Sequence, residues 1–383
     1  MFMSDRKKSN PGCLVLSFFG DKGLADNLAY VPAYPSEMSY FRPFRYRKGW
    51  IDDALWAELS QPEARTRLVD QSVILAIRFC SEGYQPLVLP FRMAKITHID
   101  FIADNVSVYF QLGAFFVHDS SLPLAKQCLR FNSDADGVPI DRLFFRCNPL
   151  SVPPVLGNGK DEDEAWITWI TAISTDDSLP FNDQARRYVF IRISRLREKK
   201  TAPIRQIYSS WSKGPIHGFQ VQEGKTYEFV YLHRVPFLLG KSQPVPRFNV
   251  TLEPHTSNWE FPSKDEEVSA NYQLHAMTMA ALTPSASWED VVLQSDRDEI
   301  ETPSAGKLYT LPFHFSVKIR KSHWHRLWTR YIWLVLLAVV VIAKDAVLSS
   351  LKGENYTLDL IVGLFTFVIL ILGYVISQKG LLK

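Results

Sequence analysis

The chain has 383 residues, of which 46% are hydrophobic and 22% are charged. These values exclude a largely disordered protein and leave room for two or three domains. The four scattered cysteines are too few for a disulfide framework or a zinc knuckle. The net charge of +3 is unevenly spread: residues 1–317 carry −3, residues 318–330 carry +5 without an acid, and residues 331–383 are mostly apolar.

The N-terminal residues do not have the pattern of a secretory signal. The first apolar run, residues 13–19, is seven residues long and no cleavage site follows it. We therefore expect the long polar region that precedes the apolar tail to lie in the cytoplasm. The sparse cysteines agree with a reducing compartment.

Strand-like segments dominate the chain before the basic segment. They are short runs rich in Val, Ile, Phe and Tyr, separated by Gly, Pro, Asn or Asp. Residues 103–105 and 222–225 are typical of hairpin turns. Helices are expected at 51–59, 62–70 and 288–294. The predicted strands cover residues 13–19, 73–79, 87–92, 96–102, 106–112, 166–173, 188–193, 226–232 and 248–252.

A change of composition divides this β-rich body. Residues 149–164 combine prolines, glycines and an acidic run, as exposed linkers and loops do. The expected fold is mainly β with some helix (α+β), in one or two sandwich-like or barrel-like cytoplasmic domains. The predicted divisions are a first domain at 1–150, a linker at 151–164, a second domain at 165–295 and a basic juxtamembrane linker at 296–326.

An aromatic and basic cluster occupies residues 40–50. Its eleven residues include five aromatic side chains, four basic ones and no acid. Aromatic faces stack on bases and guanidinium groups bind phosphates, so this mixture predicts a site for a nucleotide or for single-stranded nucleic acid. The alternative is an edge strand that buries Phe44 and Tyr46 and leaves the arginines between them in water. The candidate ligand-binding residues are Arg42, Phe44, Arg45, Tyr46, Arg47, Lys48 and Trp50.

A second basic run, residues 186–205, contains eight basic residues and one acid. Its first part is predicted to be a buried strand that ends at residue 193, so the charges after it are expected on a loop. Such a loop would meet anionic lipid, an anionic ligand or an acidic face of a neighbouring subunit, and a simply solvated loop is the alternative. The candidates here are Arg192, Arg195 and Arg197.

The C-terminal tail predicts a hairpin of two transmembrane helices, at 327–348 and 358–378. Residues 360–378 form a run of 19 without a charge. At about 1.5 Å per residue, this run nearly spans a hydrocarbon layer of about 30 Å. Aromatic residues at the entry to the first helix suit a membrane interface. The candidate pore or helix-contact residues are Lys344, Asp345, Gly363 and Gly373, and a solvated helix end is the alternative for Asp345.

Loop charge predicts the orientation of this hairpin. Basic residues flank the entry to the first helix and follow the second, whereas the loop between the helices is mixed. The positive-inside rule therefore places the N-terminal body and the C-terminus in the cytoplasm. The protein is accordingly expected to be a multi-pass protein of the inner (plasma) membrane.

The chain carries no familiar catalytic motif. Glycine-rich nucleotide loops, a G-x-S-x-G elbow and an H-E-x-x-H motif are all absent from the sequence. Residues 132–137 match the first half of a calcium loop, but Leu143 stands where the loop needs a glutamate. We therefore expect no enzymatic activity, no metal and no cofactor.

This layout, a β-rich cytoplasmic body followed by two membrane helices, resembles that of bacterial anti-phage membrane effectors. The resemblance implies a nucleotide-type signal, made by a partner protein, that acts on a soluble sensor and leads to ion leakage or membrane disruption. Two helices enclose no pore, so this interpretation requires a homo-oligomer in the lipid bilayer, with a tetramer as the working assumption. The alternative is a membrane-anchored adaptor whose surfaces recruit protein partners.

Overall fold

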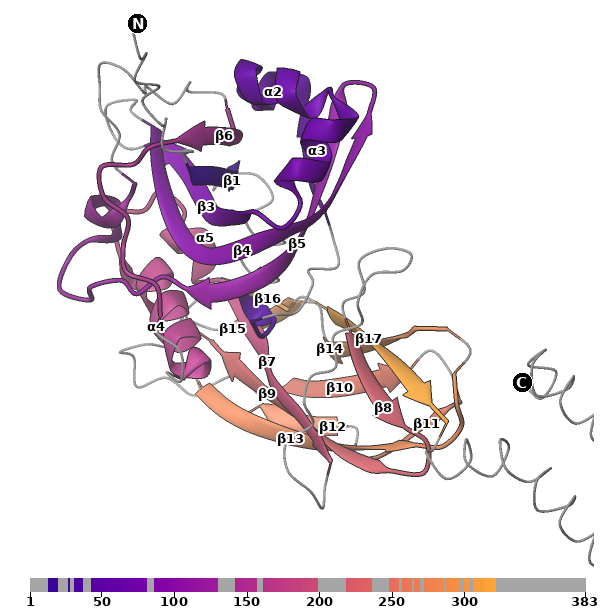
Figure 1. Cartoon of the computed structure of the whole chain (residues 1–383). Helices are drawn as coiled ribbons and strands as arrows, with labels where there is room; N and C mark the ends of the chain where they lie inside the picture. Colours follow the sequence, from indigo (N-terminus) through magenta and orange to yellow (C-terminus); the bar gives the residue numbers. More distant parts are fainter. Residues whose placement is uncertain are drawn as a thin grey trace, which may run out of the picture.

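The computed structural model is mainly β, with a curled sheet at one end, a helical region beside it and a β-sandwich at the other end (Figure 1). The predicted transmembrane hairpin lies outside the described residues, as do Arg42, Lys344, Asp345, Gly363 and Gly373. Within the described part of the chain, no helix combines the length and the apolarity needed to cross a bilayer. The structure describes residues 13–19, 27, 31–36, 43–80, 86–129, 142–156, 161–198, 218–235, 248–254, 257–263, 265–268, 272–285, 287–296, 299–302, 306–310 and 312–321.

The first sheet has six strands in the order β2-β5-β4-β3-β1-β6. Strands β1 and β3 are parallel, and the other neighbouring pairs are antiparallel. Alternate residues of β5 are buried, which is the period-two pattern of a sheet with one face on the core. The strands are β1 (Cys13–Phe19), β2 (Phe44–Arg47), β3 (Ser72–Cys80), β4 (Pro86–Ile102), β5 (Asn105–Phe115) and β6 (Phe144–Cys147).

The sheet curls until its two edges meet. Just after β2, the carbonyl of Trp50 accepts a hydrogen bond from the amide of Leu143 at 2.7 Å, and the amide of Asp52 donates to the carbonyl of Phe144 at 3.0 Å. The chain that leaves one edge strand therefore pairs with the other edge strand, β6. Short helices follow these strands: η1 (Val31–Ala33), η2 (Lys48–Trp50), α2 (Asp53–Leu59), α3 (Pro62–Leu68) and η3 (Leu124–Gln127).

The region after the first sheet is helical where a linker and a strand were expected. Helix α4 (Glu162–Thr175) begins inside the predicted linker and replaces the strand predicted at 166–173. Asp161 caps it by accepting a hydrogen bond from the amide of Asp163, and three acids occupy its first turn, where the helix dipole favours negative charge. A short helix, α5 (Asn182–Ala185), then leads to the sandwich.

The sandwich packs a five-stranded sheet, β12-β10-β14-β17-β8, on a six-stranded sheet, β11-β13-β9-β7-β16-β15. Aromatic rings join the two sheets, since Phe229 of β9 and Phe315 of β17 stack at 4.7 Å between centroids. Its strands are β7 (Tyr188–Glu198), β8 (Gly218–Gln222), β9 (Thr226–Arg234), β10 (Phe248–Pro254), β11 (Trp259–Ser263), β12 (Asp265–Val268), β13 (Tyr272–Ala281), β14 (Glu289–Ser295), β15 (Glu299–Thr302), β16 (Gly306–Thr310) and β17 (Phe313–Arg320).

Three sequence predictions about this region were wrong. The helix predicted at 288–294 is strand β14, because its apolar residues pair across a sheet instead of facing one side of a helix. Much of the linker expected at 296–326 is strand: β15, β16 and β17 complete both sheets. The turn at 222–225 does not close a hairpin, because β8 and β9 belong to different sheets. Gly224 has φ of +73° at this crossing, a conformation that favours glycine.

Candidate functional site

A pocket of about 880 Å³ opens where the two edges of the curled sheet approach each other. We call it the edge pocket. Residues of β1, of β2 and of the turn that ends at Trp50 form its walls, with Leu143 beside β6. Five of the lining side chains are aromatic: Phe18, Phe19, Phe44, Tyr46 and Trp50. The mouth of a barrel-like sheet is a frequent position for ligand sites.

Strand β2 has the alternation that an edge strand needs. Phe44 and Tyr46 are 7% and 2% exposed, whereas Arg45 and Arg47 are exposed. The Tyr46 hydroxyl donates to the carbonyl of Ser17 on β1 at 3.2 Å and so ties the two walls together. Burial raises the pKa of Tyr46, which keeps this hydroxyl protonated. The edge-strand alternative is therefore confirmed, and it places Arg45 at the rim of the pocket.

The turn that carries Trp50 is fixed by a residue distant in sequence. The Arg142 guanidinium donates to the carbonyl of Gly49 at 2.8 Å and also pairs with Asp53 at 3.0 Å. The amide of Lys48 donates to the carbonyl of Asp104 at 2.9 Å. Helix η2 is therefore held from two sides although none of its own residues is buried.

Trp50 remains 36% exposed on this turn, although it is a large aromatic side chain. The Arg47 guanidinium lies 5.7 Å from the centre of its ring. The Lys48 ammonium lies over Trp56 instead, also at 5.7 Å. The edge pocket thus offers an accessible aromatic ring with two arginines nearby, a combination that suits a planar ligand with an anionic group.

The part of the second basic run that the structure describes after residue 193 is strand where a loop was expected. Strand β7 continues to Glu198, so Arg192, Arg195 and Arg197 are all strand residues paired with β9. Arg192 is 1% exposed and lies at the interface between the two sheet regions. Its charge therefore already has internal partners, and its predicted role in ligand binding stays an expectation.

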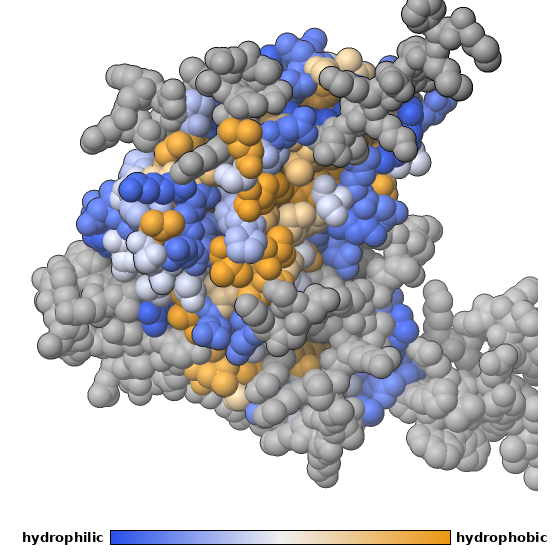
Figure 2. All heavy atoms as spheres, turned by 60° about the vertical axis from the view of Figure 1, so that its left-hand side comes forward, coloured by the Kyte–Doolittle hydropathy of each residue, from blue (hydrophilic) through white to orange (hydrophobic). Residues whose placement is uncertain are grey.

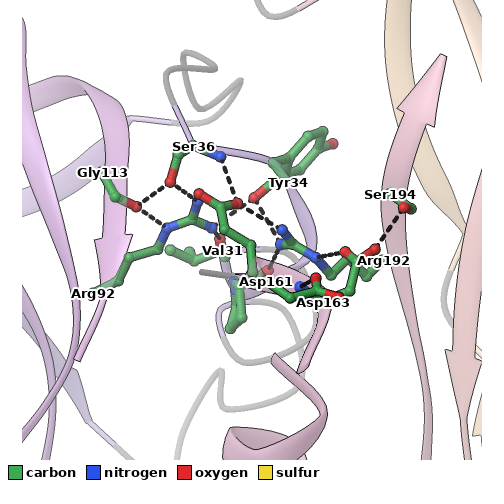
Figure 3. A network of polar contacts seen from close by, with 11 residues as sticks. Val31, Tyr34, Ser36, Arg92, Gly113, Asp161, Asp163, Arg192 and Ser194 are labelled. Atoms are coloured by element: carbon green, nitrogen blue, oxygen red, sulfur yellow. Dashed lines mark hydrogen bonds and ion pairs between the residues drawn. The ribbon is translucent and has the colours of Figure 1, made fainter. Parts of the chain in front are cut away.

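Residues 31–36, which we call the clamped segment, run between the curled sheet and the sandwich. Arg92 of β4 donates to the carbonyl of Tyr34 at 2.6 Å, and Arg192 of β7 donates to the same oxygen at 3.1 Å (Figure 3). Arg192 also reaches the carbonyl of Pro32 at 2.9 Å, and Arg92 donates to that of Gly113 at 2.7 Å. Both guanidinium groups also lie over the ring of Phe115, at 4.5 Å for Arg92 and 5.4 Å for Arg192.

The first turn of α4 neutralises these arginines. Asp163 pairs with the Arg192 guanidinium at 2.8 Å (Figure 3). Glu162 pairs with the same guanidinium at 2.7 Å. Glu162 also accepts a hydrogen bond from the amide of Ser36 at 3.1 Å. Burial raises the pKa of Glu162, but the charges of Arg92 and Arg192 and the contacts with Ser36 outweigh it and lower the pKa overall.

The clamped segment also touches the last strand of the sandwich. The Tyr34 hydroxyl donates to the carbonyl of His314, and the Tyr34 ring lies 4.6 Å from that of Phe313. Both partners belong to β17, after which the basic segment of the sequence continues towards the predicted membrane helices. One tyrosine thus joins the two sheet regions at the strand that leads to the tail.

Sequence patterns did not predict most of this network. Arg92 and Arg192 are each flanked by apolar residues within their strands, and such a charge is a usable signal because a buried charge needs partners. The acids of residues 161–164 were interpreted as a linker because no sequence pattern connects them with arginines far away in the chain. Arg142 carries no local signal, since its partners depend on the curling of the sheet.

Among the described residues, no group of three His, Cys, Asp or Glu side chains is arranged to hold a metal ion. No protein-family model matches the chain, and no curated protein sequence matches it.

Solved structures match only parts of the chain, and weakly. A cohesin module of a family 33 glycoside hydrolase from Clostridium perfringens is 12% identical, with 27% of this chain and 91% of that one covered and a TM-score of 0.19. A PapD-like domain of human CEP192 is 9% identical, covering 32% and 99%, with a TM-score of 0.19. The cupredoxin domain of amoB from Nitrosocaldus yellowstonii is 15% identical, covering 24% and 56%, with a TM-score of 0.14.

Proposed function

We propose that this protein is a membrane-attached sensor whose edge pocket binds an anionic, nucleotide-class ligand and thereby controls an oligomeric assembly of its C-terminal helices. The observation that carries the proposal is the edge pocket itself. Five of its described lining residues are aromatic, Trp50 is partly exposed there, and Arg45 also lines it. Stacking on aromatic rings and ion pairing with arginine are two interactions by which proteins hold nucleotides without a glycine-rich loop.

A route from this pocket to the tail supports the second half of the proposal. Phe18 and Phe19 line the pocket at the end of β1, and the chain then leads to the clamped segment. Tyr34 of that segment contacts β17, the described strand that lies nearest in sequence to the predicted helices. A ligand that shifts the end of β1 would therefore act on the element that precedes the membrane helices.

The binding half is tested with the purified full chain in detergent, using ATP, AMP and a short single-stranded DNA as probes. Arg45→Glu is expected to weaken binding of the preferred probe by about 10- to 100-fold, because a charge-assisted hydrogen bond is replaced by repulsion. Arg67→Glu is the matched control, since Arg67 is an exposed arginine of α3 outside the pocket. Equal binding by wild type and Arg45→Glu would refute the assignment of this pocket.

The membrane half is tested by dye release from vesicles that contain the full chain. We expect the bound probe to change release, and Tyr34→Phe to reduce that change without weakening probe binding. An adaptor would instead keep its function when the two predicted helices are replaced by an unrelated anchor. Substitutions at Asp345 or Gly373 would then also be silent.

A further inference from the structure

A second cavity, of about 490 Å³, lies on the other side of α4 from the buried arginines. We call it the α4 cavity. Helix residues at positions 161, 164, 165, 168 and 169 line it, a spacing of three and four residues that defines one face of a helix. The end of the first sheet, Phe116–His118, forms the opposite wall together with Leu156. Figure 2 turns the side that carries α4 forward and shows hydrophobic residues gathered there among hydrophilic ones.

The acidic first turn of α4 is divided between two environments. Glu162 and Asp163 face the arginine network and are neutralised by Arg192. Asp161 and Glu164 are exposed at the α4 cavity, and no cation of the described residues pairs with either. Two carboxylates at the opening of one cavity therefore remain available to a positively charged group.

The floor of the cavity is aromatic. The rings of His118 and Trp169 lie 5.2 Å apart, and Trp169 in turn stacks on Phe91 at 5.7 Å. Trp169 is 3% exposed, and its Nε1–H has no acceptor among the described residues. A buried donor without an acceptor is unfavourable, and Trp169 is one of the residues that line the cavity.

His118 does not compete with a cation for the carboxylates. Burial lowers the pKa of His118 to about 4, although the neighbouring Pro90 carbonyl and Gln127 side chain act to raise it. Neither ring nitrogen has a hydrogen-bond partner of good geometry among the described residues. The imidazole is therefore neutral at physiological pH and acts as part of the aromatic surface.

From these contacts we infer that the α4 cavity binds a guanidinium group attached to a carbon chain, as in an arginine side chain. A guanidinium is flat enough to lie on the aromatic floor, and its fork of N–H donors matches the carboxylates of Asp161 and Glu164. A small free guanidine and an arginine within a peptide share this chemistry.

The test measures binding of agmatine and of N-acetyl-arginine amide to the full chain in detergent by titration calorimetry. The double variant Asp161→Asn, Glu164→Gln should weaken binding of both probes by about tenfold or more. Asparagine also caps helices, so α4 should persist in this variant, and circular dichroism checks that it does. Glu63→Gln is the matched control, because Glu63 lies in the first turn of α3 and outside both cavities.

The probes also separate the two sources of the ligand. Tighter binding of the amide than of agmatine supports a peptide, and the reverse order supports a free guanidine. N-acetyl-norleucine amide, which lacks the charge, should bind at least tenfold more weakly than the arginine amide. The inference fails if neither charged probe binds at millimolar concentration, if the neutral amide binds equally well, or if the double variant binds like the wild type.

Discussion

Arg92 and Arg192 belong to different sheets, yet both donate hydrogen bonds to the carbonyl oxygen of Tyr34, at 2.6 and 3.1 Å. Their guanidinium groups are 0% and 1% exposed and carry like charges, so their arrangement depends on the acids of α4. The ion pairs of Arg192 with Glu162 and Asp163 supply that compensation. The clamped segment is therefore the point where curled sheet, helix and sandwich depend on one another.

Removal of the Arg192 side chain should strongly destabilise the protein. Arg192→Ala leaves Glu162 partly buried next to fewer positive charges, and breaking one partner of a buried ion pair costs about 3–5 kcal/mol. Arg192→Lys keeps the charge but loses the forked geometry, so an intermediate loss is expected. The free energy of unfolding, measured by urea titration of the full chain in detergent, checks both variants. Arg67→Ala is the control and should change it by about 0.5 kcal/mol or less.

Acid should weaken the same network. The pKa of Glu162 is lower in the folded protein than in the unfolded chain, so its contribution is complete above the unfolded value of about 4.3. That contribution disappears as the pH falls through the folded pKa. We expect the melting temperature of Glu162→Gln to lie below that of wild type at pH 7, and the difference to shrink towards pH 3. A difference that is constant over this range would contradict the assignment.

Trp50 should contribute to ligand binding by stacking. Trp50→Ala is expected to weaken binding of the preferred nucleotide probe by about 5- to 150-fold, which corresponds to about 1–3 kcal/mol for one base on one ring. Trp50→Phe retains an aromatic face and should recover much of the loss. Leu282→Ala, which changes another exposed hydrophobic residue, serves as the control in the same titration. If Trp50→Ala binds like wild type, the probe does not stack in the edge pocket.

Gly113 should not tolerate a larger side chain. Its carbonyl accepts hydrogen bonds from Arg92 and Ser36, and a Cβ added there would lie 3.0 Å from the carbonyl oxygen of Met93. Gly113→Ala should therefore destabilise the protein by about 1–3 kcal/mol through displacement of this bulged part of β5. Gly49→Ala meets no atom within 4 Å and should be nearly neutral. Thermal melts of the two variants make the comparison, and equal melting temperatures would show that the chain at Gly113 can adjust.

Local patterns were sufficient for many strands and for the edge position of β2. The strand over Cys13–Phe19 was predicted with the bounds that the structure has, because a short β-rich run bounded by turn residues carries its own signal. Asp52 likewise caps α2 through hydrogen bonds from the amides of Ala54 and Leu55. Such features depend on residues within a few positions of one another.

Helix α4 shows where local patterns fail. Its apolar residues suit either a buried strand or an amphipathic helix, and the strand interpretation was wrong. Trp166, Trp169, Ile170 and Ile173 are all buried, with the three- and four-residue spacing of a helix face. The acids before them form the N-terminal turn of that helix, and only the tertiary structure shows that Glu162 and Asp163 pair with Arg192.

By itself, the sequence determined that the body is mainly β, and it offered, as one of two interpretations, an edge strand that buries Phe44 and Tyr46 and leaves Arg45 and Arg47 in water. Only the tertiary structure decided which charges meet. It brought both sheet edges together around Trp50 and placed Arg92 and Arg192 on one carbonyl oxygen, although one hundred positions separate these arginines in the sequence. The physical reason is range: backbone preferences and periodicity act over a few residues, whereas the pairing of buried charges depends on how distant strands pack.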